Sequence, residues 1–562
     1  MLRAEPKRKR VATMNFIENE SPTKLRGGYY TDPGIAHFLT RWVFEIEPER
    51  LLEPSCGDGV FISAAQSISA PRKCFFLGIE KDPGEAHKAS RKARALKHMS
   101  AEILPQDFLS WGLSNIDGPL NFDAVLGNPP FIRYQYLDDA QQSLMEKVFE
   151  LYDLPFTKHT NAWVPFVILS VAHLRPGGRL AMVVPSEILH VLHAQSLRTF
   201  LASQCSKILL MDPVELWFEK TLQGVVLLLA EKKASASSAQ RGVAIITVKD
   251  KLFLKDAPEK YFSIADYING EVVRGKWMPA LLTGGERELL TDLSERENVF
   301  RFKEVADVDV GIVTGANKFF LVTDEVVNEY KLSRWAYPMF GRSGHAPGVI
   351  YDQETHDANR RSGLPTNFLW FGAKGLSSFP ESVRDYILKG EREGLPSRYK
   401  CRIRTPWYNV PSVYSSPVGM LKRCHDYPRL ILNRANALTT DTAYRIRVKA
   451  VDPERLVCSF VNSLTALSAE LEGRHYGGGV LEMVPSEIEK LLVPMPEAPA
   501  QLERLNGNVR AGISPRETFT SQDERLLTGV GLTRQEQGDL FDAWNRLRLR
   551  RQRATGKENP AT

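Results

Sequence analysis

Short apolar runs alternate with helix-length segments from Leu51 to about Glu231. Strands that are buried on both faces of a parallel sheet read as such runs, because helices cover both sides of the sheet. The pattern therefore predicts an α/β fold with a doubly wound, Rossmann-like sheet. The runs expected to form its strands are Arg50-Leu-Leu-Glu, Cys74-Phe-Phe-Leu-Gly-Ile-Glu, Phe122-Asp-Ala-Val-Leu-Gly, Arg179-Leu-Ala-Met-Val-Val, Lys207-Ile-Leu-Leu-Met and Gly224-Val-Val-Leu-Leu-Leu-Ala.

The 562 residues suffice for two to four domains of ~150 residues each. After about residue 300, Gly, Pro, Tyr, Trp and Arg become frequent, which is typical of a mixed, β-rich domain. The last sixty residues or so are charged and compatible with helices. We therefore expect a basic flexible arm at residues 1–20, a catalytic α/β domain at 21–245, a connector at 246–300, a β-rich domain at 301–500 and a helical, basic C-terminal tail at 501–562.

The charge balance is mildly basic, with 73 Lys and Arg against 67 Asp and Glu and a net charge of +6. This balance is compatible with a polyanionic partner but does not require one. The six cysteines contain no C-x-x-C pair, which disfavours a structural metal site or a disulfide framework and favours the reducing cytoplasm. No apolar stretch approaches the ~18 residues of a membrane span. We therefore expect neither a metal nor a membrane partner.

The stretch Leu52-Glu-Pro-Ser-Cys-Gly-Asp-Gly-Val-Phe61 joins the first expected strand to a helix through a glycine-rich turn. Glycine lets the backbone approach a ligand closely, and the start of the following helix favours an anionic group. An ordinary turn between a strand and a helix contains glycines too. Gly57 and Gly59 alone therefore leave the two interpretations about equal.

Acidic residues follow the next two expected strands. Glu80 ends the run that begins at Cys74, about twenty residues after the glycines. A carboxylate in this position can accept hydrogen bonds from both hydroxyls of a nucleoside ribose. Asp107 ends a third expected strand, where its carboxylate can receive the amino group of an adenine. Together the two acids outline an adenosine-binding site at the carboxyl edge of the sheet.

The sequence Asn128-Pro129-Pro130-Phe131 directly follows the run that begins at Phe122. The side-chain oxygen of Asn128 and the main-chain carbonyl of Pro129 can both accept hydrogens from one planar amino group. Two such acceptors draw the nitrogen toward tetrahedral geometry and free its lone pair for attack without a strong base. Phe131 can stack on the ring that carries the amino group. The motif predicts an enzyme that modifies an exocyclic amino group.

The order of these motifs resembles the S-adenosylmethionine-dependent DNA amino-methyltransferases, specifically the γ-type adenine enzymes with TaqI-like architecture. That family has a Tyr and Thr-Pro motif, then the Gly-rich loop, the acidic strand ends, Asn-Pro-Pro-aromatic and a target-recognition domain. The first motif matches Gly28-Tyr-Tyr-Thr-Asp-Pro33, with Asp32 inserted between the Thr and the Pro. The resemblance covers roughly residues 24–496 and includes the stretches 177–185, 216–220, 311–320 and 476–485.

The resemblance implies a class I methyltransferase domain at 21–245, a DNA target-recognition domain at 301–500 and S-adenosylmethionine as the cofactor. It assigns catalysis to Asn128, Pro129, Pro130 and Phe131, and stacking on the target base to Phe131 and Phe218. Thr31 and the turn from Cys56 to Gly59 would hold the methionine end of the cofactor, Glu80 its ribose and Asp107 its adenine. The residues assigned to cofactor binding are Tyr30, Thr31, Glu53, Pro54, Cys56, Gly57, Gly59, Glu80, Asp107 and Asn128.

The resemblance also implies a substrate, double-stranded DNA, and a reaction, methylation of the exocyclic amino group of adenine after base flipping. Such an enzyme is the modification half of a restriction-modification system in the bacterial cytoplasm, associated with the nucleoid. Only about thirty residues precede the first cofactor motif, which is too few for a nuclease domain. A cognate restriction endonuclease is therefore expected as a separate chain, not necessarily in contact with this one.

An enzyme that flips a base must hold the surrounding duplex. The region after residue 300 interleaves basic and aromatic residues, which suit phosphate contacts and base reading. The candidates are Lys318, Arg334, Arg342, Lys400, Arg402, Arg404, Lys422, Arg423, Arg434, Arg445, Arg447 and Arg474, with Trp335, Tyr337, Trp407, Tyr408 and Tyr444.

Three alternatives remain open on the sequence. A protein-glutamine methyltransferase also uses Asn-Pro-Pro-aromatic, but it needs neither the Thr-Pro segment nor the long basic region. An RNA amino-methyltransferase has the same motifs. A non-catalytic DNA-binding specificity protein would have no physical reason to keep the motifs intact. Cys56 is interpreted as a small loop residue and not as a nucleophile, because cytosine carbon-5 methylation uses a Pro-Cys dipeptide that this chain lacks.

Overall fold

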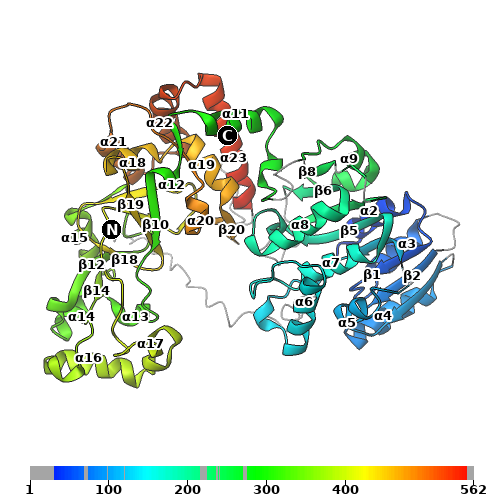
Figure 1. Cartoon of the computed structure of the whole chain (residues 1–562), viewed down its shortest axis with the longest axis horizontal. Helices are drawn as coiled ribbons and strands as arrows, with labels where there is room; N and C mark the ends of the chain where they lie inside the picture. The colour runs from blue at the N-terminus through cyan, green and yellow to red at the C-terminus, as the bar shows by residue number, and fades with distance from the viewer. Residues whose placement is uncertain are drawn as a thin grey trace, which may run out of the picture. The chain divides into compact units, whose positions relative to one another are not determined.

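The computed structural model describes residues 31–68, 74–97, 99–118, 121–214, 224–235, 238–239, 241–269, 275–476 and 478–553. The chain forms two compact units, each with its own sheets (Figure 1). Unit 1 comprises Met1–Trp217 and Val225–Gly275, and unit 2 comprises Phe218–Gly224 and Lys276–Thr562. The main division falls inside the expected connector. Within the described ranges, no helix is both long and apolar enough to cross a membrane.

Unit 1 is built on an eight-stranded sheet with the order β3-β2-β1-β4-β5-β7-β6-β8. The pairs among β1 to β5 are parallel, as expected for a doubly wound sheet. The strands are β1 (Arg50–Glu53), β2 (Cys74–Ile79), β3 (Met99–Leu104), β4 (Phe122–Gly127), β5 (Leu174–Pro185), β6 (Cys205–Pro213), β7 (Val225–Lys232) and β8 (Gly242–Val248).

One strand of this sheet differs from the sequence prediction. β7 is antiparallel to both of its neighbours, β5 and β6, whereas its apolar run was expected to form a parallel strand. A strand buried on both faces is apolar whichever way it runs, so the sequence pattern carries no signal for direction. The expected α/β fold class is otherwise confirmed.

Four described helices of unit 1 start at an aspartate, and Asp138 is the one that caps α6. Asp32, Asp82 and Asp107 each accept hydrogen bonds from backbone N–H groups in the first turn of α2, α4 and α5. Such caps fix where each helix begins. The helices of unit 1 are α2 (Pro33–Phe44), α3 (Val60–Ser67), α4 (Pro83–Arg94), α5 (Phe108–Ser114), α6 (Asp139–Leu151), α7 (Trp163–Ala172), α8 (Gln195–Gln204) and α9 (Pro258–Ile264).

Unit 2 is a mixed unit with small sheets, as the change in composition after residue 300 predicts. A five-stranded sheet has the order β10-β19-β15-β17-β13, and a four-stranded sheet has the order β11-β14-β12-β18. The remaining strands form sheets of three and two. The strands are β9 (Val299–Arg301), β10 (Ala306–Val310), β11 (Leu321–Val322), β12 (Ala336–Phe340), β13 (Ile350–Tyr351), β14 (Asn367–Leu369), β15 (Val418–Leu421), β16 (Arg423–Cys424), β17 (Leu430–Asn433), β18 (Leu438–Thr439), β19 (Ala443–Val448), β20 (Arg474–Tyr476), β21 (Val480–Glu482) and β22 (Leu492–Pro494).

The helices expected near the end of the chain pack into the core of unit 2. Trp544 is fully buried, and its ring lies 4.6 Å from the ring of Phe519 and 6.4 Å from that of Tyr427. The helices of unit 2 are α11 (Gly284–Glu295), α12 (Phe302–Val305), α13 (Asn317–Phe320), α14 (Asp324–Glu329), α15 (Gln353–Arg361), α16 (Glu381–Arg392), α17 (Tyr399–Arg402), α18 (Pro453–Ser459), α19 (Ser463–Glu472), α20 (Pro485–Ile488), α21 (Leu502–Arg510), α22 (Pro515–Gly529) and α23 (Arg534–Gln552).

Candidate cofactor and target-base site

The predicted site residues of unit 1 gather at the carboxyl ends of neighbouring parallel strands. β1 pairs with β2 on one side and with β4 on the other, and Leu52 lies opposite Val125. Glu53, at the end of β1, and Asn128, directly after β4, are therefore adjacent in the sheet although 74 other residues separate them in the chain. This edge is where open α/β sheets bind ligands, because the strand order reverses there.

The turn after β1 is shaped by two glycines in left-handed backbone conformations. Gly57 has a φ of 50° and Gly59 has a φ of 84°. The Gly59 N–H donates to the carbonyl of Cys56 at 2.8 Å, which closes the turn ahead of α3. A Cβ atom built on Gly57 would meet nothing within 4 Å, so the backbone here borders open space. A ligand can approach the turn closely at this point.

Cys56 is held inside the same turn. Its backbone N–H donates to the carbonyl of Ile79 at 3.0 Å, and its side chain is 2% exposed. Its Sγ atom would lie only 3.1 Å from a Cβ atom placed on Gly78. Burial, followed by the charges of Glu53 and Glu80, raises the pKa of the thiol far above its usual value. The geometry gives Cys56 a packing role and makes it a poor nucleophile.

Glu80 connects the second strand to the glycine turn. One carboxylate oxygen accepts from the Gly57 N–H at 2.9 Å, and the other accepts from the Asp82 N–H at 2.8 Å. Burial raises the pKa of Glu80, and the two backbone hydrogen bonds partly oppose that effect. Glu80 thus fixes the turn and keeps acceptor capacity next to the open space beside Gly57.

Glu53 carries an unsatisfied buried oxygen. Its side chain is 1% exposed, and its Oε2 atom has no hydrogen-bond partner among the described residues. Burial, and then the charges of Glu80 and Asp58, raise the pKa of Glu53 well above its usual value. A buried carboxylate without a donor is costly unless a ligand supplies one. The α-ammonium group of S-adenosylmethionine is such a donor, so this position fits the cofactor.

Asp107 caps α5 and has additional partners. It accepts from the Ser110 N–H at 3.1 Å and from Gln141 Nε2 at 3.2 Å, and Lys81 Nζ lies 3.8 Å away. The carboxylate is thus held after β3 by groups from α5, from α6 and from the segment between β2 and α4. Each of its oxygens can accept a further hydrogen bond. The expected contact to an adenine amino group stays a prediction.

Asn128 is held from two sides. Its Nδ2 atom donates to Thr31 Oγ1 at 3.2 Å, and its main-chain carbonyl accepts from Ser55 Oγ at 2.9 Å. Pro129 is buried, and Phe131 is half-buried. The contact with Thr31 gives that residue a role in positioning the Asn-Pro-Pro-Phe motif, which the sequence did not indicate. Ser55 was also missed, because a serine inside a glycine turn has no distinctive pattern.

The backbone after the motif is anchored by the start of α7. The Ala162 N–H donates to the carbonyl of Ile132 at 2.8 Å, and Asn161 Nδ2 donates to Glu187 Oε2 at 3.1 Å. Burial raises the pKa of Glu187. These residues lie far apart in the sequence, so no local pattern could have found them. Of the predicted residues, Tyr30 and Phe218 lie outside the described ranges.

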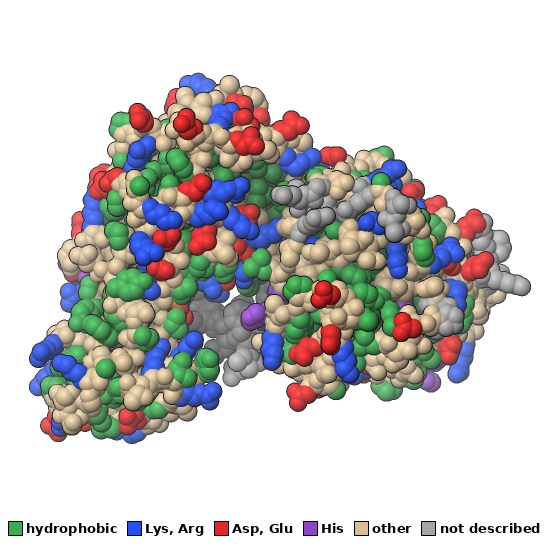
Figure 2. Space-filling model, viewed as in Figure 1, with side chains coloured by type: hydrophobic (Ala, Val, Ile, Leu, Met, Phe, Trp, Pro, Cys, Tyr) green, Lys and Arg blue, Asp and Glu red, His purple; other side chains and the backbone are tan. Residues whose placement is uncertain are grey.

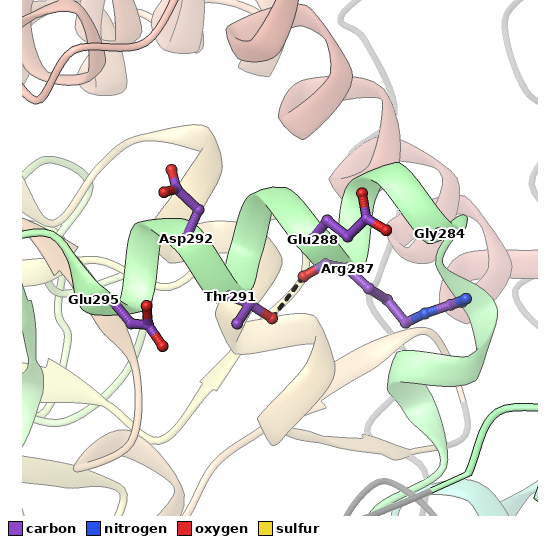
Figure 3. Close-up of a pocket in the computed structure, with 6 residues that line it drawn as sticks. All are labelled: Gly284, Arg287, Glu288, Thr291, Asp292 and Glu295. Atoms are coloured by element: carbon purple, nitrogen blue, oxygen red, sulfur yellow. Dashed lines mark hydrogen bonds between the residues drawn. The ribbon is translucent and has the colours of Figure 1, made fainter.

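A shallow pocket in unit 2 contains none of the predicted site residues. It lies along a single face of α11, where Thr291 Oγ1 donates to the carbonyl of Arg287 at 2.9 Å (Figure 3). Its lining residues are Gly284, Arg287, Glu288, Thr291, Asp292 and Glu295. Three carboxylates on one helix face disfavour a nucleic acid or another anion at this place.

Many of the basic and aromatic candidates of unit 2 already make contacts within the unit. Trp407, Tyr408 and Tyr444 are buried, so they belong to the core and do not stack on bases. Arg404 and Arg445 donate to backbone carbonyls. The residues that form ion pairs are Lys422, Arg423, Arg434, Arg447 and Arg474.

Two family models match the chain, one in each unit. Residues 71–215 match the model of the Eco57I restriction-modification methylase. Residues 274–527 match the model of the C-terminal domain of the type II methyltransferase M.Eco57I. The border between the two matches lies near the border between the two units.

Individual relatives have the same description. The type II methyltransferase M.AccI of Acinetobacter calcoaceticus is 21% identical over 485 residues, which is 82% of this chain and 84% of the relative. The type II methyltransferase M.BanIII of Aneurinibacillus aneurinilyticus is 24% identical over 451 residues, with coverage of 69% and 74%. Among solved structures, the type IIG restriction endonuclease BpuSI aligns with 94% of this chain and 67% of its own, at 14% identity and a TM-score of 0.42.

The matched models and relatives are described as a restriction-modification methylase and as type II methyltransferases. In both units the chain is therefore similar to type II restriction-modification methyltransferases, a family whose cofactor is S-adenosylmethionine.

Proposed function

We propose that the protein transfers the methyl group of S-adenosylmethionine to the exocyclic amino group of adenine in duplex DNA, after the base has been flipped out of the helix. The observation that carries the proposal is the position of the Asn128-Pro129-Pro130-Phe131 motif. It directly follows β4, beside the end of β1, and it is held by Thr31 and Ser55. A flipped base would be required, because an amino nitrogen inside a stacked duplex cannot reach this edge.

The residues around the motif suit attack by an amino nitrogen. The Asn128 side-chain oxygen and the Pro129 carbonyl would accept one hydrogen each from the amino group, so that its lone pair is turned toward the methyl donor. Pro130 restricts the backbone on both sides of the Pro129–Pro130 bond and so holds the Pro129 carbonyl in one direction. Phe131 would stack on the purine ring.

The cofactor supplies an electrophilic methyl group on a sulfonium. Glu53 would accept from its α-ammonium group, Glu80 from its ribose hydroxyls and Asp107 from its adenine amino group. The amino proton would leave to solvent after transfer. Tyr30 and Phe218 stay candidates for the cofactor site and for the second face of the base. The biological setting would be the modification half of a restriction-modification system, acting at the nucleoid.

The test uses Asn128→Ala with Asn115→Ala as a matched control, because Asn115 is an amide at the end of α5 outside the motif. We expect Asn128→Ala to abolish methyl transfer to DNA while the affinity for S-adenosylhomocysteine stays within about twofold of wild type. Digestion of methylated DNA to nucleosides, followed by mass spectrometry, identifies the product. Full activity in Asn128→Ala contradicts the mechanism, and N4-methylcytosine in place of N6-methyladenine contradicts the base assignment.

A further inference from the structure

One stretch of unit 2 has no acidic residue. Residues 394–425 contain no Asp or Glu, although these two residue types make up 67 of the 562 residues, about one in eight. The same stretch contains six basic residues, namely Arg398, Lys400, Arg402, Arg404, Lys422 and Arg423. Positive charge is therefore much more concentrated in residues 394–425 than the net charge of +6 for the whole chain indicates.

Three of these cations are available to a partner. Arg398, Lys400 and Arg402 are exposed, and within the part of the chain that the structure describes they form no ion pair. By contrast, Lys422 and Arg423 both contact Glu482, at 3.1 and 2.5 Å. Arg398 is the N-cap of the short helix α17, and Lys400 and Arg402 lie within this helix, which is labelled in Figure 1.

Large apolar side chains lie among these cations. Tyr399 is 63% exposed and Ile403 is 62% exposed. Lys400 Nζ lies 5.3 Å and Arg402 Cζ 5.5 Å from the centre of the Tyr399 ring. We call residues 398–403 the Tyr399 knuckle. Figure 2 shows basic and hydrophobic side chains next to each other on the edge of the lobe where α17 lies.

The Tyr399 knuckle is anchored to the rest of unit 2 by a buried side chain and by hydrogen bonds. Cys401 is fully buried, and Arg404 donates to the carbonyls of Thr314 at 2.7 Å and Val313 at 2.6 Å. Gly315, with a φ of 77°, lies so close that a Cβ atom on it would come within 2.6 Å of Lys400 Cβ. The cations are thus presented on a rigid support, which lowers the entropy lost when a partner binds.

We propose that the Tyr399 knuckle is a contact surface for duplex DNA. Arg398, Lys400 and Arg402 neutralise backbone phosphates, and Tyr399 and Ile403 cover sugar and base edges beside them. The absence of acidic residues over the whole stretch matches a polyanion, which would be repelled by interspersed carboxylates. The inference rests on the proposed function, since it names the surface through which the DNA substrate is held.

The test is the salt dependence of binding. Each phosphate contact contributes a slope of about 0.9 in a plot of log Kd against log salt concentration. The double variant K400A/R402A is therefore expected to lower the slope by about 2 and to weaken binding about 10- to 100-fold near 0.1 M salt. Tyr399→Ala is expected to weaken binding without changing the slope. Fluorescence anisotropy of the full chain with a labelled DNA duplex measures both quantities.

The matched control is R361A/R504A, which removes two exposed charges from α15 and α21 of the same unit. Its slope should equal that of wild type. The inference is overturned if K400A/R402A leaves the slope unchanged or if the control loses as much binding as K400A/R402A. It is also overturned if the protein binds duplex RNA in preference to duplex DNA. If wild type binds DNA through the knuckle but methylates cytosine, the proposed reaction fails and the surface stands. If wild type binds no duplex, both fail.

Discussion

The Nδ2 atom of Asn128 lies 3.2 Å from the Oγ1 atom of Thr31, which precedes the N-cap of α2. The two atoms of a side-chain amide lie on opposite sides of Cγ, so this contact also fixes the direction of the Asn128 oxygen. We therefore expect Thr31, which the sequence assigned to the cofactor, to position the Asn128 oxygen that would accept from the target amino group. The contact links the residue before the N-cap of α2 to the residue after β4.

Thr31→Val removes the acceptor for Asn128 and keeps the volume of the side chain. The lost hydrogen bond is worth about 0.5–1.5 kcal/mol, so we expect kcat to fall about 3- to 10-fold with little change in KM for the cofactor. Thr31→Ser keeps the hydroxyl group and should therefore have a kcat close to that of wild type. Thr40→Val, which removes a buried hydroxyl from α2 that donates only to Ala36, is the control. An unchanged kcat in Thr31→Val would contradict the positioning role.

Glu53→Gln removes the carboxylate that we expect to face the ammonium group of the cofactor. A charge-assisted hydrogen bond is worth about 1.5–3 kcal/mol, so S-adenosylhomocysteine should bind about 10- to 100-fold more weakly. Because the pKa of Glu53 is raised in the free protein, wild-type affinity should decrease as pH falls, when the carboxyl becomes neutral. Glu53→Gln should flatten this dependence. Calorimetry from pH 6 to 8 measures the affinity for S-adenosylhomocysteine. Glu102→Gln, at an exposed position, is the control. Wild-type affinity in Glu53→Gln would exclude a contact between Glu53 and the cofactor.

Asp523 makes the stability of unit 2 depend on pH. Its carboxylate accepts from the Ser463 N–H at 2.9 Å and from Ser463 Oγ at 2.5 Å, but burial raises its pKa to about 7. The folded state therefore favours the neutral acid, so the associated stability is present below about pH 4 and is lost as pH rises through about 7. The difference approaches about 4 kcal/mol. Urea unfolding at pH 5 and pH 8 should show this loss for wild type and a smaller one for Asp523→Asn. Asp542→Asn, on the surface of α23, should behave as wild type.

The buried pair of Glu470 and Arg551 holds α23 against α19. The Arg551 Nη2 and Glu470 Oε1 atoms are 2.6 Å apart, and neither side chain is exposed. Burial alone would raise the pKa of Glu470, but the charge and hydrogen bonds of Arg551 and His475 lower it to about 2. Glu470→Ala leaves an uncompensated buried charge and should lower the unfolding free energy by about 3–5 kcal/mol. The double variant E470M/R551M should lose less. If both variants lose the same amount, the pair is not coupled.

The sequence predicted those site residues whose position depends only on where one strand ends. Glu53, Glu80 and Asn128 each follow an apolar run, so their common edge follows from the parallel order of the strands. Thr31 and Ser55 were placed beside Asn128 only by tertiary packing. The aromatic residues of unit 2 show the opposite error, because Trp407 and Tyr408 look like base-stacking residues in sequence and are core residues in the fold. Burial is a property of the whole unit, so composition does not reveal it.

The burial of Trp544 by Phe519 and Tyr427 has a consequence for biosynthesis. Every strand of the unit 1 sheet has been translated by residue 248, so unit 1 can fold on the ribosome. Unit 2 cannot close its core until α23 has emerged, which takes on the order of tens of seconds longer at ordinary elongation rates. During that interval its apolar surfaces are available to chaperones. A complete unit 2 therefore arises late, after unit 1.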